Sequence, residues 1–159
     1  MDGARVEFLQ SKKRLESCNH MLNVSYRLLK DPKILLSVAT NLLKACEFAI
    51  NTLLEIGVED KVIPSYKKND FRSKHNLFIQ KIISSYNINK IHIKTVSRLK
   101  EIVMMHKKSS VEFSRKKKFV MADESYELRT LSESDMKNYY QKTKKFLEQV
   151  EGVLHERLN

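Results

Sequence analysis

The stretch DPKILLSVATNLLKACEFAINTLLEIG, residues 31–57, decides the fold class. Asp31 can accept hydrogen bonds from the free N–H groups at a helix start, and Pro32 suits the first helical position. Gly57 is typical of a left-handed residue that ends a helix. The apolar residues between these signals occupy more than one helical face, which predicts a long and mostly buried helix. A membrane span is disfavoured because four polar residues interrupt the stretch. These are Thr40, Asn41, Lys44 and Glu47.

The sequence on either side of this stretch shows further helical periodicity. Apolar residues at intervals of three and four predict four more helices. Their expected ranges are 4–30, 70–86, about 95–113 and 133–157. The inward stripe expected on the first of them consists of Val6, Leu9, Leu15, Cys18, Leu22, Ser25, Tyr26 and Leu29. The chain contains only three glycines and two prolines, which favours long helices with short links over a turn-rich β fold.

Helix-start signals precede two of these segments. Asn69 or Asp70 can accept hydrogen bonds from the free N–H groups of the helix that begins near residue 70. Ser132, followed three residues later by Asp135, resembles a capping box. This pair places the start of the last helix at about residue 133.

One short segment alternates with the period of a strand. In KFVMADESYELRTL, apolar and polar residues alternate on both sides of ADES, which predicts a hairpin of Phe119–Met121 against Tyr126–Leu128. The chain has 159 residues, enough for one domain with a sizeable core. We therefore expect an all-α fold over residues 1–159, an up-and-down bundle of four to five helices with a small β-hairpin before the last helix.

Positive charge is concentrated in the middle of the chain. The net charge is +11, and residues 61–118 alone contain sixteen Lys or Arg residues against three acidic residues. The densest part is HKKSSVEFSRKKKFV, residues 106–120. Its expected binding residues are Lys107, Lys108, Arg115, Lys116, Lys117 and Lys118.

Such a surface attracts polyanions. Lys and Arg neutralise phosphates and release counterions, so RNA or DNA is one expected partner and an acidic protein surface is another. Tyr126 on the hairpin, and also Phe119, could add stacking on single-stranded bases. The same run also fits a solvated basic turn or a nuclear-localisation signal.

The same stretch holds the residue types of a catalytic triad. His106, Ser109 or Ser110, and Glu112 lie within seven residues. An activated serine needs a strained turn and nearby oxyanion donors, and a regular helix supplies neither. We therefore interpret these residues as the polar end of a helix.

No metal site or cofactor is expected. None of the five histidines pairs with another at a spacing of three or four residues, and the three glycines form no phosphate-binding loop. Arg72 and His75 are three residues apart and could contact a phosphate together, although a pair near a helix start is the simpler interpretation.

The cysteine pattern and the N-terminus favour the cytoplasm. Cys18 and Cys46 each lie in a helical pattern, so we expect buried free thiols in a reducing compartment. The N-terminal residues MDGARVEFLQSKKR lack the apolar core of a secretory signal. A membrane location is not expected.

The order of helices resembles the HEPN family, prokaryotic helical bundles that often form homodimers and include many RNases. Active members carry an arginine, a histidine a few positions later and an aromatic residue two positions after that. If Phe113 matches the aromatic residue, Val111 stands at the histidine position and His106 at the arginine position. The resemblance therefore implies a non-catalytic member that lacks the RNase motif.

These observations predict a HEPN-like module without enzymatic activity that binds nucleic acid or an acidic protein through its basic surface. One alternative is a divergent HEPN ribonuclease that uses Arg98 and His106, or Arg72 and His75, across a dimer interface. Another is a purely structural interaction bundle, marked by a large exposed apolar patch. A homodimer is also expected, and a monomer in light scattering at micromolar concentration would contradict it.

Overall fold

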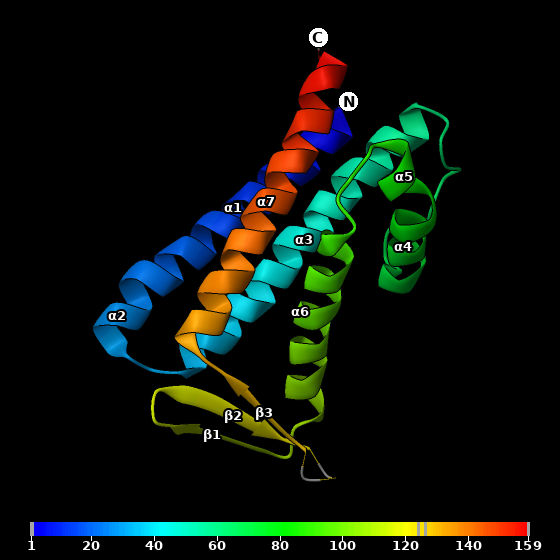
Figure 1. Ribbon diagram of the computed structural model, residues 1–159. Helices are drawn as coiled ribbons and strands as arrows, with labels where there is room; N and C mark the ends of the chain where they lie inside the picture. Colours follow the sequence, from blue (N-terminus) through cyan, green and yellow to red (C-terminus); the bar gives the residue numbers. More distant parts are fainter. Residues whose placement is uncertain (1, 124, 126, 159) are drawn as a thin grey trace.

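The computed structural model describes residues 2–123, 125 and 127–158 (Figure 1). The first helical segments are α1 Asp2–His20, the π-helical turn η1 Met21–Ser25, α2 Tyr26–Leu29 and α3 Lys33–Glu59. They are followed by α4 Phe71–Leu77, the π-helical turn η2 Phe78–Ile82, α5 Ile83–Ser85 and α6 Ile91–Lys108. The strands are β1 Val111–Arg115, β2 Lys118–Ala122 and β3 Leu128–Leu131, and α7 Glu133–Leu158 ends the chain. The prediction of a helical bundle with a small antiparallel β element before the last helix is confirmed.

Helix α3 is the centre of the bundle, as its sequence predicted. It contacts α1, α6 and α7, and fourteen of its residues are buried. Its apolar side chains form a single cluster with those of the surrounding helices and of β2. By length and hydropathy alone α3 could also cross a membrane, a property that it shares with core helices of soluble proteins. A cytoplasmic location stays a prediction.

The predicted helix starts are confirmed by their hydrogen bonds. The Asp31 carboxylate accepts from the Lys33 N–H at 3.0 Å. The Asp70 carboxylate accepts from the Ser73 N–H at 3.2 Å. At the last helix, the Asp135 N–H donates to the Ser132 hydroxyl at 3.1 Å, and the Ser132 N–H donates back to the Asp135 carboxylate at 3.3 Å.

The prediction that Gly57 ends its helix is wrong. Helix α3 continues to Glu59, and Lys61 is the residue that takes a left-handed conformation, with φ of 61°. A Cβ atom on Gly57 would lie 2.8 Å from Ile82 Cδ1 and 3.3 Å from Ile63 Cγ1. The glycine therefore lets two neighbouring segments approach α3 closely, and at the helix end its carbonyl oxygen accepts from the Val62 N–H at 2.9 Å.

The predicted inward stripe of the first helix is partly wrong. Val6 and Leu9 are each 57% exposed, and Leu29 is 70% exposed. Ala4, Phe8 and Ser11 face the core instead, and the Ser11 hydroxyl donates to the Ala45 carbonyl oxygen of α3 at 2.6 Å. A serine whose hydroxyl is hydrogen-bonded can be buried in a core like a small apolar residue. The predicted stripe was chosen mainly from apolar residues, so it did not include Ser11.

The segment before the last helix is a three-stranded sheet in the order β1-β2-β3, one strand more than predicted. Helix α6 ends at Lys108, so the expected helix up to about Phe113 is wrong. Residues 111–115 pair with β2 in the register Arg115↔Lys118. The connecting residues Lys116 and Lys117 both have positive φ, 48° and 64°, as a tight two-residue hairpin turn requires.

The predicted strand Phe119–Met121 is confirmed within β2, and its partner begins at Leu128, two residues later than predicted. Two lysines are unusual in such a turn, where asparagine and glycine are the common signal. The sequence therefore gave no sign of the β1–β2 hairpin. Tyr126 lies outside the described residues.

The two cysteines are buried free thiols, as predicted. Cys46 lies 3.8 Å from the Thr143 hydroxyl, and Cys18 lies 3.6 Å from the Val38 carbonyl oxygen. Burial raises the pKa of both thiols to about 12. Because the thiolate is the reactive form, both cysteines have a packing role.

Candidate nucleic-acid interface

The β1–β2 turn is held against the second helical segment. The Tyr26 hydroxyl of α2 donates a hydrogen bond to the Lys117 carbonyl oxygen at 3.3 Å, which joins residues 91 positions apart. Figure 1 shows this turn on the side of the sheet nearest α2, while α6 ends at the opposite side. The contact therefore brings the basic turn to a second basic segment of the chain.

Five residues line a hollow of about 140 Å³ at this contact. They are Tyr26, Arg27, Lys30, Lys117 and Glu133, and we call this site the basic hollow. Three of them are cations from two distant segments. A water molecule occupies about 30 Å³ in the liquid, so the hollow has room for several waters or for one phosphate group.

The carboxylate among these lining residues, Glu133, is paired with a lysine outside the basic hollow. Glu133 forms an ion pair with Lys137 at 2.8 Å, one helical turn along α7. Burial raises the pKa of Tyr26, and the nearby Glu133 charge raises it further, so Tyr26 remains a protonated hydrogen-bond donor. The charge of Arg27, Lys30 and Lys117 is therefore available to an anion.

The backbone at this site is strained. Five described residues other than glycine have positive φ, and three of them are Lys30, Lys116 and Lys117. A left-handed conformation costs an L-residue with a Cβ roughly 1–2 kcal/mol, and glycine or asparagine would lower that cost. Such strain clusters at functional sites. At these three positions, lysine has a higher conformational free energy than glycine or asparagine would have.

The structure brings together only part of the predicted binding set. Arg115, Lys116, Lys117 and Lys118 are all exposed at or beside the β1–β2 turn. Lys107 and Lys108 end α6 at the other end of β1, and a strand of that length spans about 14 Å. The six residues therefore belong to two separate places. Arg27 and Lys30 were missed because no local signal links them to the turn.

Lys107 belongs to a second group of lysines, around Glu47 of α3. Burial raises the pKa of Glu47, and the charges of four lysines oppose that rise. They are Lys100, Lys74, Lys44 and Lys107. Lys74 also donates to the Asn51 side-chain oxygen at 2.9 Å, and the Lys100 ammonium lies 4.2 Å from the Phe71 ring centroid. Lys74 and Lys100 therefore make contacts that connect α4 with α3 and with α6.

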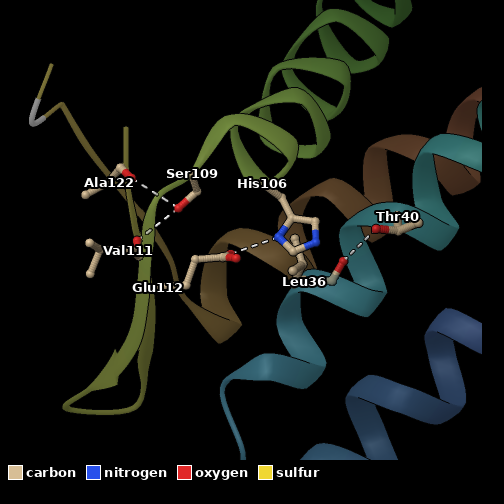
Figure 2. Close-up of polar contacts among 7 residues, drawn as sticks. All are labelled: Leu36, Thr40, His106, Ser109, Val111, Glu112 and Ala122. Carbon is tan, nitrogen blue, oxygen red and sulfur yellow. Dashed lines mark hydrogen bonds and ion pairs between the residues drawn. The ribbon is translucent and has the colours of Figure 1, made fainter. Parts of the chain in front are cut away.

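The residues considered as a triad form a pair instead (Figure 2). The chain leaves α6 at Lys108 and turns back, so Glu112 on β1 lies 2.8 Å from His106 Nδ1. The interpretation of Glu112 as part of a helix end is wrong, because Glu112 lies in β1. The Ser109 hydroxyl donates to the Val111 carbonyl oxygen at 2.9 Å and also lies 3.2 Å from that of Ala122. It is therefore directed away from His106.

The residue pairs of the ribonuclease alternative do not converge within one chain. Arg98 and His106 are eight residues apart on α6, a rise of about 12 Å. Arg72 is exposed, whereas the His75 ring stacks on Phe71 with centroids 5.6 Å apart. Neither pair presents a histidine and an arginine to one phosphate within the chain.

His92 is held as a neutral ring in the core. It is 3% exposed and stacks on Phe146 with centroids 4.9 Å apart. The Gln149 side-chain oxygen accepts from the Asn89 N–H at 3.0 Å and lies 3.1 Å from His92 Nε2, so Nε2 carries the hydrogen. Burial lowers the pKa of His92 against the opposing effect of this hydrogen bond, and burial also lowers the pKa of His75, with a further contribution from Lys100.

These lowered pKa values predict a loss of stability in acid. The unfolded chain binds a proton near pH 6.5, before the folded protein does, so the free energy of unfolding falls as pH decreases below about 6.5. We expect urea melts of the His92→Gln variant to show a weaker pH dependence than the wild type between about pH 7 and pH 5. His20→Gln, at an exposed site, is the control and should keep the pH dependence of the wild type. Equal pH dependence in wild type and His92→Gln would contradict the prediction.

A wider groove of about 610 Å³ lies between the start of α6 and α7. Four of its nine lining residues are Asn or Gln, and its charged residues are Lys142, Lys145 and Glu148. The groove has two cations against one acid, whereas the basic hollow has three cations against one acid, so the electrostatic attraction for phosphate is stronger at the basic hollow. The basic hollow is therefore the more strongly cationic of the two sites.

Of the two aromatic residues proposed for stacking, Phe119 lies among the described residues. Phe119 is 3% exposed and packs in the core, so the prediction that it stacks on bases is wrong. Phe113 is 42% exposed on β1. It was missed because it was assigned to the end of a helix.

Neither a family model nor a curated protein nor a solved structure matches the chain. The HEPN-like relationship therefore stays a prediction. Function is inferred from the site itself.

Proposed function

We propose that this protein is a nucleic-acid-binding helical module that holds RNA or DNA phosphates at the basic hollow and the β1–β2 turn. One observation carries the proposal: the contact between Tyr26 and Lys117 gathers cations from two distant segments around one hollow. A phosphate there would meet Arg27, Lys30 and Lys117 together. Charge-assisted contacts of this kind give binding that tolerates sequence and weakens with salt.

We further propose that the module is a cytoplasmic, non-catalytic relative of the HEPN proteins with an up-and-down bundle. Support comes from the order of the helical segments and from Val111, which stands at the histidine position and lies in a strand. RNA cleavage needs a positioned general acid or base, and valine cannot serve as one. An acidic protein is the alternative partner for the same surface.

A salt series on the wild-type protein tests the proposal. Binding of labelled RNA and DNA is measured by filter retention between about 50 and 200 mM salt. We expect the logarithm of the association constant to fall linearly with the logarithm of salt concentration, with a slope that reports about three or more phosphate contacts. Binding that is undetectable at low salt, or that ignores salt, would falsify the electrostatic proposal.

A further inference from the structure

The two faces of the sheet have different surroundings. Side chains alternate along a strand, so Glu112 and Ser114 of β1 share one face, and Val111, Phe113 and Arg115 share the other. Glu112 is opposite Met121, which is fully buried, and it also reaches His106 of α6. The Glu112 face therefore looks toward the helices. The face of Phe113 looks away from them, and Figure 1 shows β1 as the strand farthest from the bundle.

The outer face combines apolar and cationic side chains. Phe113 is 42% exposed, and Val111 and Leu128 are 53% and 69% exposed. Arg115 is two residues beyond Phe113 on the same face, and it is paired across the hairpin with Lys118. Residues two apart on a strand are about 7 Å apart, so one nucleotide can reach both the Phe113 ring and the Arg115 charge.

This combination favours one class of nucleic acid. An exposed aromatic ring binds a base by stacking on its face, and neighbouring cations hold the phosphates on either side. In a duplex, the base faces are covered by neighbouring base pairs and cannot stack on a side chain without unpairing. The outer face of the sheet therefore suits a single strand.

We propose that this protein binds single-stranded nucleic acid, with one base stacked on Phe113 and the phosphates on the side of the β1–β2 turn held by Arg115 and Lys118. This inference rests on the proposed function and names the class of its ligand. The bound nucleic-acid strand continues past the β1–β2 turn to the basic hollow, because Lys117 belongs to both the turn and the hollow. Phe113 supplies contact with the base, and the lysines and arginines supply contact with the backbone.

The test uses the absence of tryptophan from the chain. Phe113→Trp introduces one indole at the proposed stacking position, and its fluorescence should be quenched by single-stranded oligouridine. Phe113→Ala removes the ring, while Leu128→Ala removes an exposed apolar side chain from the same face and is the matched control. Binding of labelled oligouridine and of a duplex is measured by anisotropy for each variant.

We expect Phe113→Ala to weaken binding of the single strand by about 5- to 150-fold, with an unchanged salt slope and unchanged duplex affinity. Phe113→Trp should retain wild-type affinity and show quenching. Leu128→Ala should bind as the wild type does.

Three results would overturn the inference. If Phe113→Ala binds the single strand with unchanged affinity and unchanged salt dependence, Phe113 makes no stacking contact. The proposed function would not be affected by that result. Equal losses in Phe113→Ala and Leu128→Ala would indicate a general apolar contact. Displacement of the oligouridine by polyglutamate at equal charge concentration would favour an acidic protein partner. Absence of any wild-type binding would instead defeat the proposed function itself.

Discussion

Replacing the three cations of the basic hollow is expected to weaken RNA or DNA binding about 100-fold or more at 0.1 M salt. The combined variant is Arg27→Gln, Lys30→Asn and Lys117→Asn. Asparagine is chosen because Lys30 and Lys117 have positive φ, 51° and 64°, which asparagine tolerates better than most residues. Each lost phosphate contact should also lower the magnitude of the salt slope by about 1, giving a total of about 3. The measurement is filter binding across a salt series.

A second variant with the same change of net charge controls for general electrostatics. Lys12→Gln, Lys67→Gln and Lys81→Gln remove three exposed lysines from other parts of the surface. We expect this variant to keep most of the affinity and the salt slope. If both triple variants lose affinity equally, binding depends on net charge alone, and the basic hollow has no special role.

Phe146→Ala is expected to lower the free energy of unfolding by about 3–5 kcal/mol. Phe146 is fully buried on α7, and its ring contacts Phe78 and His92 at centroid distances of 5.7 Å and 4.9 Å. Truncation removes contacts to both rings and leaves a cavity between α7, α6 and η2. Because small proteins are stable by about 5–15 kcal/mol in total, much of the stability would be lost. Urea unfolding followed by circular dichroism measures it.

The control for this prediction is a phenylalanine at the surface. Phe113→Ala should change the free energy of unfolding by no more than about 0.5 kcal/mol, since its ring is 42% exposed. The same measurement shows that the variant used in the binding test is folded. A loss below about 1 kcal/mol for Phe146→Ala would mean that the ring does not fill the core as described.

Local signals in the sequence were sufficient wherever the structure depends on neighbours along the chain. Asp31, Asp70 and the pair of Ser132 and Asp135 predicted the starts of three helices, and each makes the predicted hydrogen bond. The central helix was predicted from its own pattern, because burial on several faces needs apolar residues on several faces. These features depend on positions within four residues of each other.

Features that depend on distant neighbours were predicted poorly. The buried face of α1 depends on Ser11, which is accepted in the core because Ala45 supplies its hydrogen-bond acceptor. Strand β1 forms because residues 111–115 find a partner in β2 through a turn made of lysines. A helical period of 3.6 residues describes one segment at a time, so it could not reveal that Ser11 meets Ala45 or that β1 pairs with β2.

The sequence by itself determined a helical protein with a central buried helix, a β element before the last helix and a concentrated positive charge. Tertiary structure alone decided where that charge acts. It separated Lys107 and Lys108 from the basic turn, and it joined Arg27 and Lys30 to Lys117. The physical reason is that charge acts through space, and the hydrogen bond that brings these cations together connects Tyr26 with Lys117, 91 positions along the chain.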